Sequence, residues 1–274
     1  MAAISAAMVK ELRDRVGAGV MDAKKALEAA DGDQSKAEEI LKEEGLADAA
    51  KRAGRETSEG LVQSYIHPGN RIGTLVEVNC ETDFVAKNDS FVTLANELAE
   101  LALGYDSKDS FLAADYKGMS VQDKLTEQTG VIGEKIEIGG FEKLSAPFVG
   151  SYIHAGNKIA VLTGLSAAVE GADTVAKDVS MQAAAMNPVA LNEEGVDQSV
   201  IDKEIEIAKD QLRQEGKPEA MLDNIAKGKL NRFFKDNTLV NQAFIKDSKQ
   251  SVSDYVKSVD SNLEVTNFKR VALG

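Results

Sequence analysis

The apolar residues near the start of the chain come in three sets, each with the three- and four-residue spacing of an amphipathic helix. The three sets are Val9, Leu12 and Val16; Val20, Ala23 and Leu27; and Ala37, Ile40 and Leu41. Turn-forming residues at 17–19 and 31–33 separate them, and Gly45 is expected to end the third helix. We therefore predict a three-helix module, the kind of small domain that docks on other proteins, followed by a linker over residues 47–58 whose start can be helical.

A segment in the middle of the chain is repeated. Residues 64–75 read SYIHPGNRIGTL, and residues 151–162 read SYIHAGNKIAVL. In each copy an alternating segment reaches a Gly-Asn turn and continues as an apolar run, which is the pattern of a β-hairpin. The likeness extends further, because DFVAKN at 83–88 matches DTVAKD at 173–178, each at the start of a helical segment. The sequence thus predicts a duplicated unit that combines a hairpin with a helix.

The two copies differ at a position that bears on function. Phe84 of the first copy corresponds to Thr174 of the second. A residue needed in a shared core should stay apolar in both copies, so the difference indicates that Phe84 serves something outside the core. Thr82 or Asp83 is suited to cap the helix that carries Phe91, which would put Phe84 on its first turn. The alternative is a buried ring that packs between strand and helix.

The last third of the chain predicts a helical hairpin and a return to the core. Residues 200–235 alternate charged and apolar positions at helical spacing, with an interruption by Gly-Lys-Pro at 216–218. We expect two antiparallel helices, which serve either as a contact element or as a solvated projection. The chain then returns through Phe244, a short helix near 252–256 and a terminal strand around 265–271.

Composition and charge narrow the classes of function. Of the 274 residues, 43% are hydrophobic and 28% charged, as in ordinary globular proteins. The net charge of −13 argues against nucleic acid as the main partner, because nonspecific binding needs a cationic surface. No apolar stretch approaches the roughly 18 residues of a membrane span, and residues 1–10 lack the pattern of a secretory signal. With Cys80 as the single cysteine, an intramolecular disulfide is impossible, and we predict a cytoplasmic protein.

Motifs of enzymes and cofactor sites are incomplete. GAGVMD at 17–22 lacks the last glycine of a dinucleotide fingerprint, and DGDQSK at 31–36 lacks the glycine that turns a calcium loop. No phosphate-binding loop occurs, so we expect no cofactor, no metal and no covalent chemistry. His67 and His154 occupy the same place in the two hairpins and are interpreted as hydrogen-bonding residues at hairpin ends; a hydrolase that uses either is a remote alternative. Cys80 lies in an apolar run and is expected to pack rather than react.

Two motifs resemble the signatures of a known family. VKELR at 9–13 with GAGVMDAKKAL at 17–27, and EVNCETDFVAKN at 77–88, are similar to the two signatures of the bacterial elongation factor Ts family. The similarity continues through the hairpin repeat and the helical hairpin, so it covers essentially the whole chain. It implies a guanine nucleotide exchange factor for elongation factor Tu, a GTPase that delivers aminoacyl-tRNA. A noncatalytic adaptor or chaperone that binds a GTPase without exchange is the alternative.

The resemblance implies an α+β fold, in which a three-helix module like ubiquitin-associated domains precedes two related α+β subdomains with a projecting antiparallel helical hairpin. The expected divisions are 1–55 for the N-terminal module and the start of the linker, 56–140 for the core N-subdomain, 141–200 for the first part of the core C-subdomain, 201–236 for the helical hairpin and 237–274 for the return to the core C-subdomain. A homodimer or a 2:2 complex with the partner fits this pattern. Because residues 270–274 lack the extra C-terminal helix of some relatives, we expect affinity to depend more on the N-terminal module.

The resemblance also implies roles for individual residues. Thr82, Asp83 and Phe84 form the exchange motif, in which Asp83 and Phe84 insert between helices of the partner's GTPase domain and disturb the site of Mg²⁺ and the β-phosphate. An N-terminal patch that docks on the same domain consists of Lys10, Arg13, Val20, Met21 and Lys24. Further contacts with the partner are implied for Lys51, for the loop of Ile132, Gly133 and Glu134, and for His154.

Overall fold

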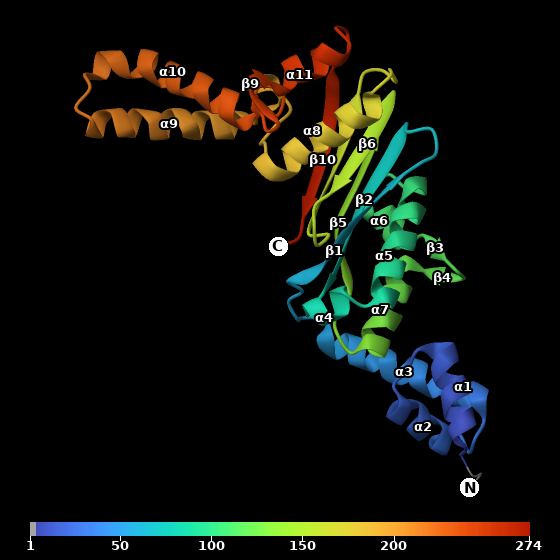
Figure 1. The fold of residues 1–274 in the computed structure, drawn as a ribbon. Helices are drawn as coiled ribbons and strands as arrows, with labels where there is room; N and C mark the ends of the chain where they lie inside the picture. Colours follow the sequence, from blue (N-terminus) through green and yellow to red (C-terminus); the bar gives the residue numbers. More distant parts are fainter. Residues whose placement is uncertain (1–3) are drawn as a thin grey trace. The chain divides into compact units, whose positions relative to one another are not determined.

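The computed structural model describes residues 4–274, which form a mixed α+β fold with helices at the N-terminus, as predicted (Figure 1). The first three residues of the predicted N-terminal module lie outside the described part. The chain divides into two compact units. The first contains the described residues up to Gln63, with Val76–Glu142 and Ala272–Gly274; the second contains Ser64–Leu75 and Lys143–Val271. The predicted five-part division is not tested by these units and stays a prediction.

The first unit begins with three helices. Helix α1 (Ala6–Val16) ends at Gly17, whose φ of 74° favours glycine, and α2 (Val20–Ala29) follows. The side chain of Asp33 caps α3 (Gln34–Arg52) at its start. The buried residues that form the core cluster of the module are Val9, Leu12, Ala23, Ala26, Leu27, Ala30 and Ala37. The predicted three-helix module is therefore confirmed, with small alanines allowing the helices to approach closely.

The prediction that Gly45 ends the third helix is wrong. Helix α3 continues to Arg52, and Gly45 lies where it crosses α7 (Val121–Ile132). A Cβ on Gly130 of α7 would lie 2.5 Å from the Cα of Gly45, so the backbone of α3 leaves no room for a side chain on Gly130, whereas a Cβ on Gly45 would lie 3.6 Å from the Cα of Gly130. Gly45 therefore lies inside a helix at a close crossing, and the sequence alone does not distinguish this position of a glycine from one that ends a helix.

A three-stranded sheet has the strand order β1 (Glu59–Ile66), β2 (Ile72–Cys80), β5 (Glu137–Ser145). The predicted single helix after β2 is in fact two. Helix α4 (Asp83–Ala86) is one turn long, and α5 (Asp89–Leu101) carries the buried Phe91. The chain breaks at Asn88, which is extended and accepts a hydrogen bond from the N–H of Ser90 at 2.9 Å, so it caps a new helix. Further elements are the 3-10 turn Ala102–Gly104, α6 (Lys108–Leu112), β3 (Asp115–Tyr116) and β4 (Met119–Ser120).

The two predicted hairpins form with matching turns. The backbone N–H of His67 donates to the carbonyl of Ile72 at 3.0 Å, as that of His154 donates to Ile159 at 2.8 Å. The asparagine of each Gly-Asn pair has a φ of 55°, in the left-handed region that asparagine tolerates better than most residues. The repeat seen in the sequence is thus a repeat of backbone geometry.

The second unit contains the sheet β10 (Val265–Ala272), β7 (Ile159–Leu165), β6 (Phe148–Ile153), in which β6 and β7 pair antiparallel. Helix α8 (Ala172–Met186) packs on β6 and β7 through Val175 and Val179. Further elements of this unit are the 3-10 turn Glu193–Gly195, β8 (Ala243–Phe244), β9 (Asp247–Ser251) and α11 (Val252–Val259). The predicted short helix and terminal strand are confirmed.

The helical hairpin is confirmed as α9 (Gln198–Gln214) and α10 (Glu219–Asn237), which Figure 1 shows side by side in orange. Leu212 and Leu222 are buried, and Lys209 pairs across the hairpin with Asp223 at 2.6 Å.

Among residues 4–274 no helix combines the length and the apolar character needed to cross a membrane.

Candidate functional site

The one-turn helix α4 presents an aromatic ring to solvent. The side chain of Phe84 is 83% exposed, more than any other large hydrophobic residue in the described part of the chain. The alternative in which the ring packs between strand and helix is therefore wrong. Burial of a phenylalanine side chain contributes about 1.5–3 kcal/mol, a gain that Phe84 forgoes in the free protein.

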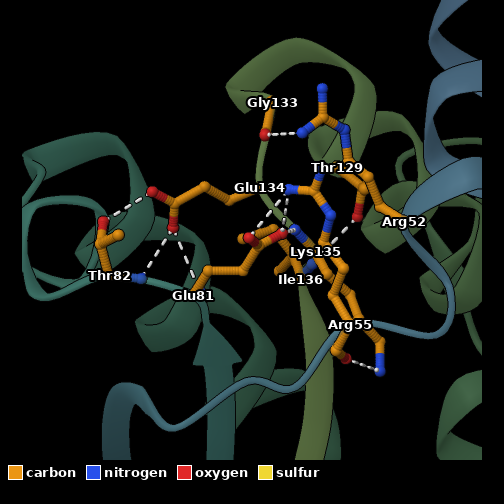
Figure 2. Close-up of polar contacts among 9 residues, drawn as sticks. All are labelled: Arg52, Arg55, Glu81, Thr82, Thr129, Gly133, Glu134, Lys135 and Ile136. Carbon is orange, nitrogen blue, oxygen red and sulfur yellow. Dashed lines mark hydrogen bonds and ion pairs between the residues drawn. The ribbon is translucent and has the colours of Figure 1, made fainter.

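Glu134 accepts three hydrogen bonds from the segment that leads into α4 (Figure 2). Its Oε2 accepts from the backbone N–H of Glu81 at 3.1 Å and from that of Thr82 at 2.9 Å, and its Oε1 accepts from the Thr82 hydroxyl at 2.6 Å. Thr82 holds the cap position of α4 by its extended backbone, but its side chain makes no hydrogen bond to α4. The predicted cap residue is thus itself held by the loop after α7.

Glu81 makes the reciprocal contact. Its Oε1 accepts from the backbone N–H of Lys135 at 2.7 Å, and its Oε2 lies 3.0 Å from Nη1 of Arg55. The Lys135 N–H and the Arg55 guanidinium lower the pKa of Glu81, although partial desolvation opposes them. The guanidinium of Arg52, at the end of α3, donates to the carbonyl of Gly133 (Figure 2). One polar network therefore joins Arg52 and Arg55 to residues 81–82 and 133–135.

Other contacts stiffen α4 itself. Nζ of Lys87 lies 2.6 Å from Oδ2 of Asp83, one helical turn away, and this contact raises the pKa of Lys87. The thiol of Cys80 donates to the carbonyl of Thr82 at 3.1 Å. Phe84 itself thus stands on a short helix whose flanking residues are restrained on both sides.

We expect Cys80 to be unreactive in the folded protein. It is fully buried, and desolvation, with the nearby Glu134 carboxylate, raises the pKa of its thiol to about 12. At pH 8 the thiolate fraction is then about 10⁻⁴. A thiol reagent such as DTNB should label Cys80 only after urea unfolds the chain. Labelling of the native protein at the rate of free cysteine would contradict this expectation.

A groove on α1 and α2 brings together four of the residues predicted for the N-terminal patch. It is lined by Ile4, Ala6, Val9, Lys10, Arg13, Val20 and Lys24. Val20 and the adjacent Met21 are 53% and 61% exposed, so Val20 does not join the core that its hydrophobic spacing predicts. Exposed apolar side chains framed by cations are suited to a protein surface that is itself partly apolar and acidic.

The remaining predicted residues are divided between the two units. Ile132 ends α7, and Gly133 follows with a φ of 80° and its carbonyl in the polar network. Lys51 is exposed on α3 and pairs with Asp48 at 3.0 Å. His154 belongs to the second unit, where its Nδ1 lies 3.1 Å from the hydroxyl of Tyr152. Within residues 4–274 no three or more His, Cys, Asp or Glu side chains group as a metal site would require.

The sequence does not predict the hydrogen bonds by which the carboxylates of Glu81 and Glu134 hold the segment before α4. The hydrogen bond from the Glu81 N–H to Glu134 joins residues 53 positions apart. No periodicity or local motif reports a contact at that separation. The family resemblance points to the loop that contains Glu134, but as a contact with a partner; the local signal is that Glu134 directly follows Gly133, a glycine suited to end a helix.

Comparison with known proteins identifies the family. The family model described as elongation factor TS matches residues 81–274, more than half of the chain. An elongation factor Ts of Christiangramia forsetii is 69% identical over 274 residues, and one of Flavobacterium psychrophilum is 60% identical over 274 residues; each match covers 100% of both chains. An elongation factor Ts of Clostridium kluyveri is 43% identical over 286 residues, covering 99% of this chain and 93% of the relative. The chain that carries the anchored Phe84 therefore belongs to the elongation factor Ts family of translation factors.

Proposed function

We propose that the protein binds elongation factor Tu and accelerates the release of its GDP, without covalent chemistry of its own. The observation that carries the proposal is the 83% exposed ring of Phe84 on a turn held by Glu134. Asp83 and Phe84 insert between helices of the partner's GTPase domain and disturb the site that holds Mg²⁺ and the β-phosphate. The groove with Lys10 and Val20 docks on the same domain and supports the insertion.

Exchange follows from linkage between the two binding events. GDP is held largely through its phosphates and the metal, so a partner conformation that breaks those contacts binds GDP weakly. An exchange factor that binds this conformation more tightly shifts the partner toward that conformation. By linkage, bound nucleotide weakens the binding of the exchange factor to the same extent as the exchange factor weakens the binding of nucleotide. Burial of the Phe84 ring supplies about 1.5–3 kcal/mol, or roughly a tenfold to hundredfold change in affinity. Binding of GTP can then displace the factor.

The further contacts belong to the same proposal. Lys51 and Ile132 would meet the GTPase domain, and His154 would meet another domain of the partner. The hairpin of α9 and α10 would serve a homodimer or a 2:2 complex. These roles stay predictions.

The test is the release of fluorescently labelled GDP from elongation factor Tu in the presence of excess unlabelled nucleotide. We expect substoichiometric amounts of the protein to raise the release rate in proportion to its concentration, with each molecule serving many GTPase molecules. Stable binding to the GTPase with an unchanged release rate would overturn the proposal and favour the noncatalytic adaptor or chaperone.

A further inference from the structure

We infer that Glu134 is a positioning residue for nucleotide exchange, which braces the start of α4 so that the Phe84 ring projects in one fixed direction. The inference rests on the proposed function and deepens it. Glu134 acts through the backbone of Glu81 and Thr82, and the inference does not require it to touch the partner.

Helix α4 needs a brace because it cannot hold itself. It comprises four residues, and none of its side chains is buried. A single helical turn fixes several backbone dihedral angles in return for very few hydrogen bonds, so it is unfavourable in isolation. Because Val85 and Ala86 are only partly buried, α4 depends on contacts at its ends.

Glu134 supplies the contact at the N-terminal end. Backbone N–H groups at a helix start have no partner within the helix and need an acceptor. One carboxylate here accepts from the N–H of the cap residue Thr82, from the N–H of Glu81 just before it, and from the Thr82 hydroxyl. Hydrogen bonds to a charged acceptor are roughly twice as strong as neutral ones. Glu134 therefore directly holds Glu81 and Thr82, which precede Phe84 in the chain.

The brace is anchored at its other end. Gly133 caps the C-terminal end of α7, where its backbone N–H donates to the carbonyl of Thr129 at 3.0 Å. The carbonyl of Gly133 accepts a hydrogen bond from the guanidinium of Arg52. On the other side of Glu134, the N–H of Lys135 donates to Glu81 at 2.7 Å. Because the backbone is held on both sides of Glu134, its carboxylate has little freedom to follow α4, and it restrains α4 instead.

The first test compares two substitutions at position 134. Glu134→Ala removes both carboxylate oxygens, and with them all three hydrogen bonds, and should lower kcat/KM for GDP release about tenfold. In Glu134→Gln the side-chain oxygen can still accept from the N–H groups of Glu81 and Thr82, and the side-chain NH2 can donate to the Thr82 hydroxyl. This variant should therefore retain most of the activity. Equal loss in both variants would overturn a positional role, because the geometry is preserved in one and absent in the other.

The control is Glu97→Ala in the same unit. The Glu97 carboxylate accepts from the Tyr116 hydroxyl and from Lys117, so its removal costs a comparable set of contacts elsewhere. We expect GDP release to be unchanged in this variant. A loss equal to that of Glu134→Ala would show a general effect of lost contacts and overturn the inference.

A double-mutant cycle separates positioning from other effects. If Glu134 acts through the position of the Phe84 ring, adding Glu134→Ala to Phe84→Ala should cost much less than Glu134→Ala costs in the wild-type protein, whereas multiplicative losses would overturn the inference. Amide hydrogen exchange at residues 81–86 of the free protein gives a readout that is independent of the partner. It should quicken in Glu134→Ala and stay slow in Glu134→Gln. Unchanged protection of these amides against exchange in Glu134→Ala would refute the role of Glu134 as a brace. If the wild-type protein fails to accelerate GDP release from elongation factor Tu, the proposed function alone is refuted.

Discussion

Replacement of Phe84 by alanine is expected to slow GDP release from elongation factor Tu roughly tenfold to hundredfold, which corresponds to the loss of about 1.5–3 kcal/mol of burial in the complex. The fold should be unaffected, because the ring is 83% exposed in the free protein. Surface substitutions of this kind change the free energy of unfolding by no more than about 0.5 kcal/mol. Stopped-flow release of labelled GDP and urea unfolding measure the two quantities on the same sample.

Two further variants sharpen this experiment. Phe84→Thr copies Thr174, the residue at the equivalent place of the second copy, and should be as slow as Phe84→Ala. Met186→Ala removes a different exposed apolar side chain, 48% exposed in the second unit, and should leave release unchanged. Normal release by Phe84→Ala would contradict the proposed role of the ring, as would a loss that accompanies unfolding.

The elements that the sequence predicts correctly are those defined by local patterns. Helical spacing around Leu12 and Leu27, the paired Gly-Asn turns, and the break before α10 at Pro218 all depend on neighbouring residues. Helix ends are predicted less well, because they depend on what a segment packs against. Gly45 is interior to α3 since it faces Gly130 of another helix, and Asn88 starts a helix that the apolar pattern alone would have continued.

The candidate site shows the same division. The solvent-facing role of Phe84 follows from comparison of two copies within one chain, because Thr174 shows that the shared core does not need an aromatic ring there. Val20 misleads for a related reason: helical spacing assigns it to the core, yet an apolar residue reserved for a partner has the same spacing and is 53% exposed. The support from Glu134 depends on tertiary contacts, which no local pattern encodes.

The second large effect is expected at the crossing of α3 and α7. Gly130→Ala would place a Cβ 2.5 Å from the Cα and 2.8 Å from the carbonyl oxygen of Gly45. These are backbone atoms that cannot rotate away, so the helices must shift. Overpacking costs about 1–3 kcal/mol and more at rigid sites, against about 1 kcal/mol gained from the helix propensity of alanine, so we expect a net loss near 2 kcal/mol. Urea unfolding followed by circular dichroism measures it.

The same crossing provides its own control. A Cβ on Gly45 would lie 3.6 Å from the Cα of Gly130, which is an ordinary van der Waals contact, so Gly45→Ala should be neutral or stabilising. Gly228→Ala in α10 meets nothing within 4 Å and should also be stabilising. Equal destabilisation by Gly45→Ala and Gly130→Ala would contradict the asymmetry of the crossing. Because α3 carries Arg52 into the network around Glu134, a shift at Gly130 should also slow GDP release, which Gly45→Ala should leave intact.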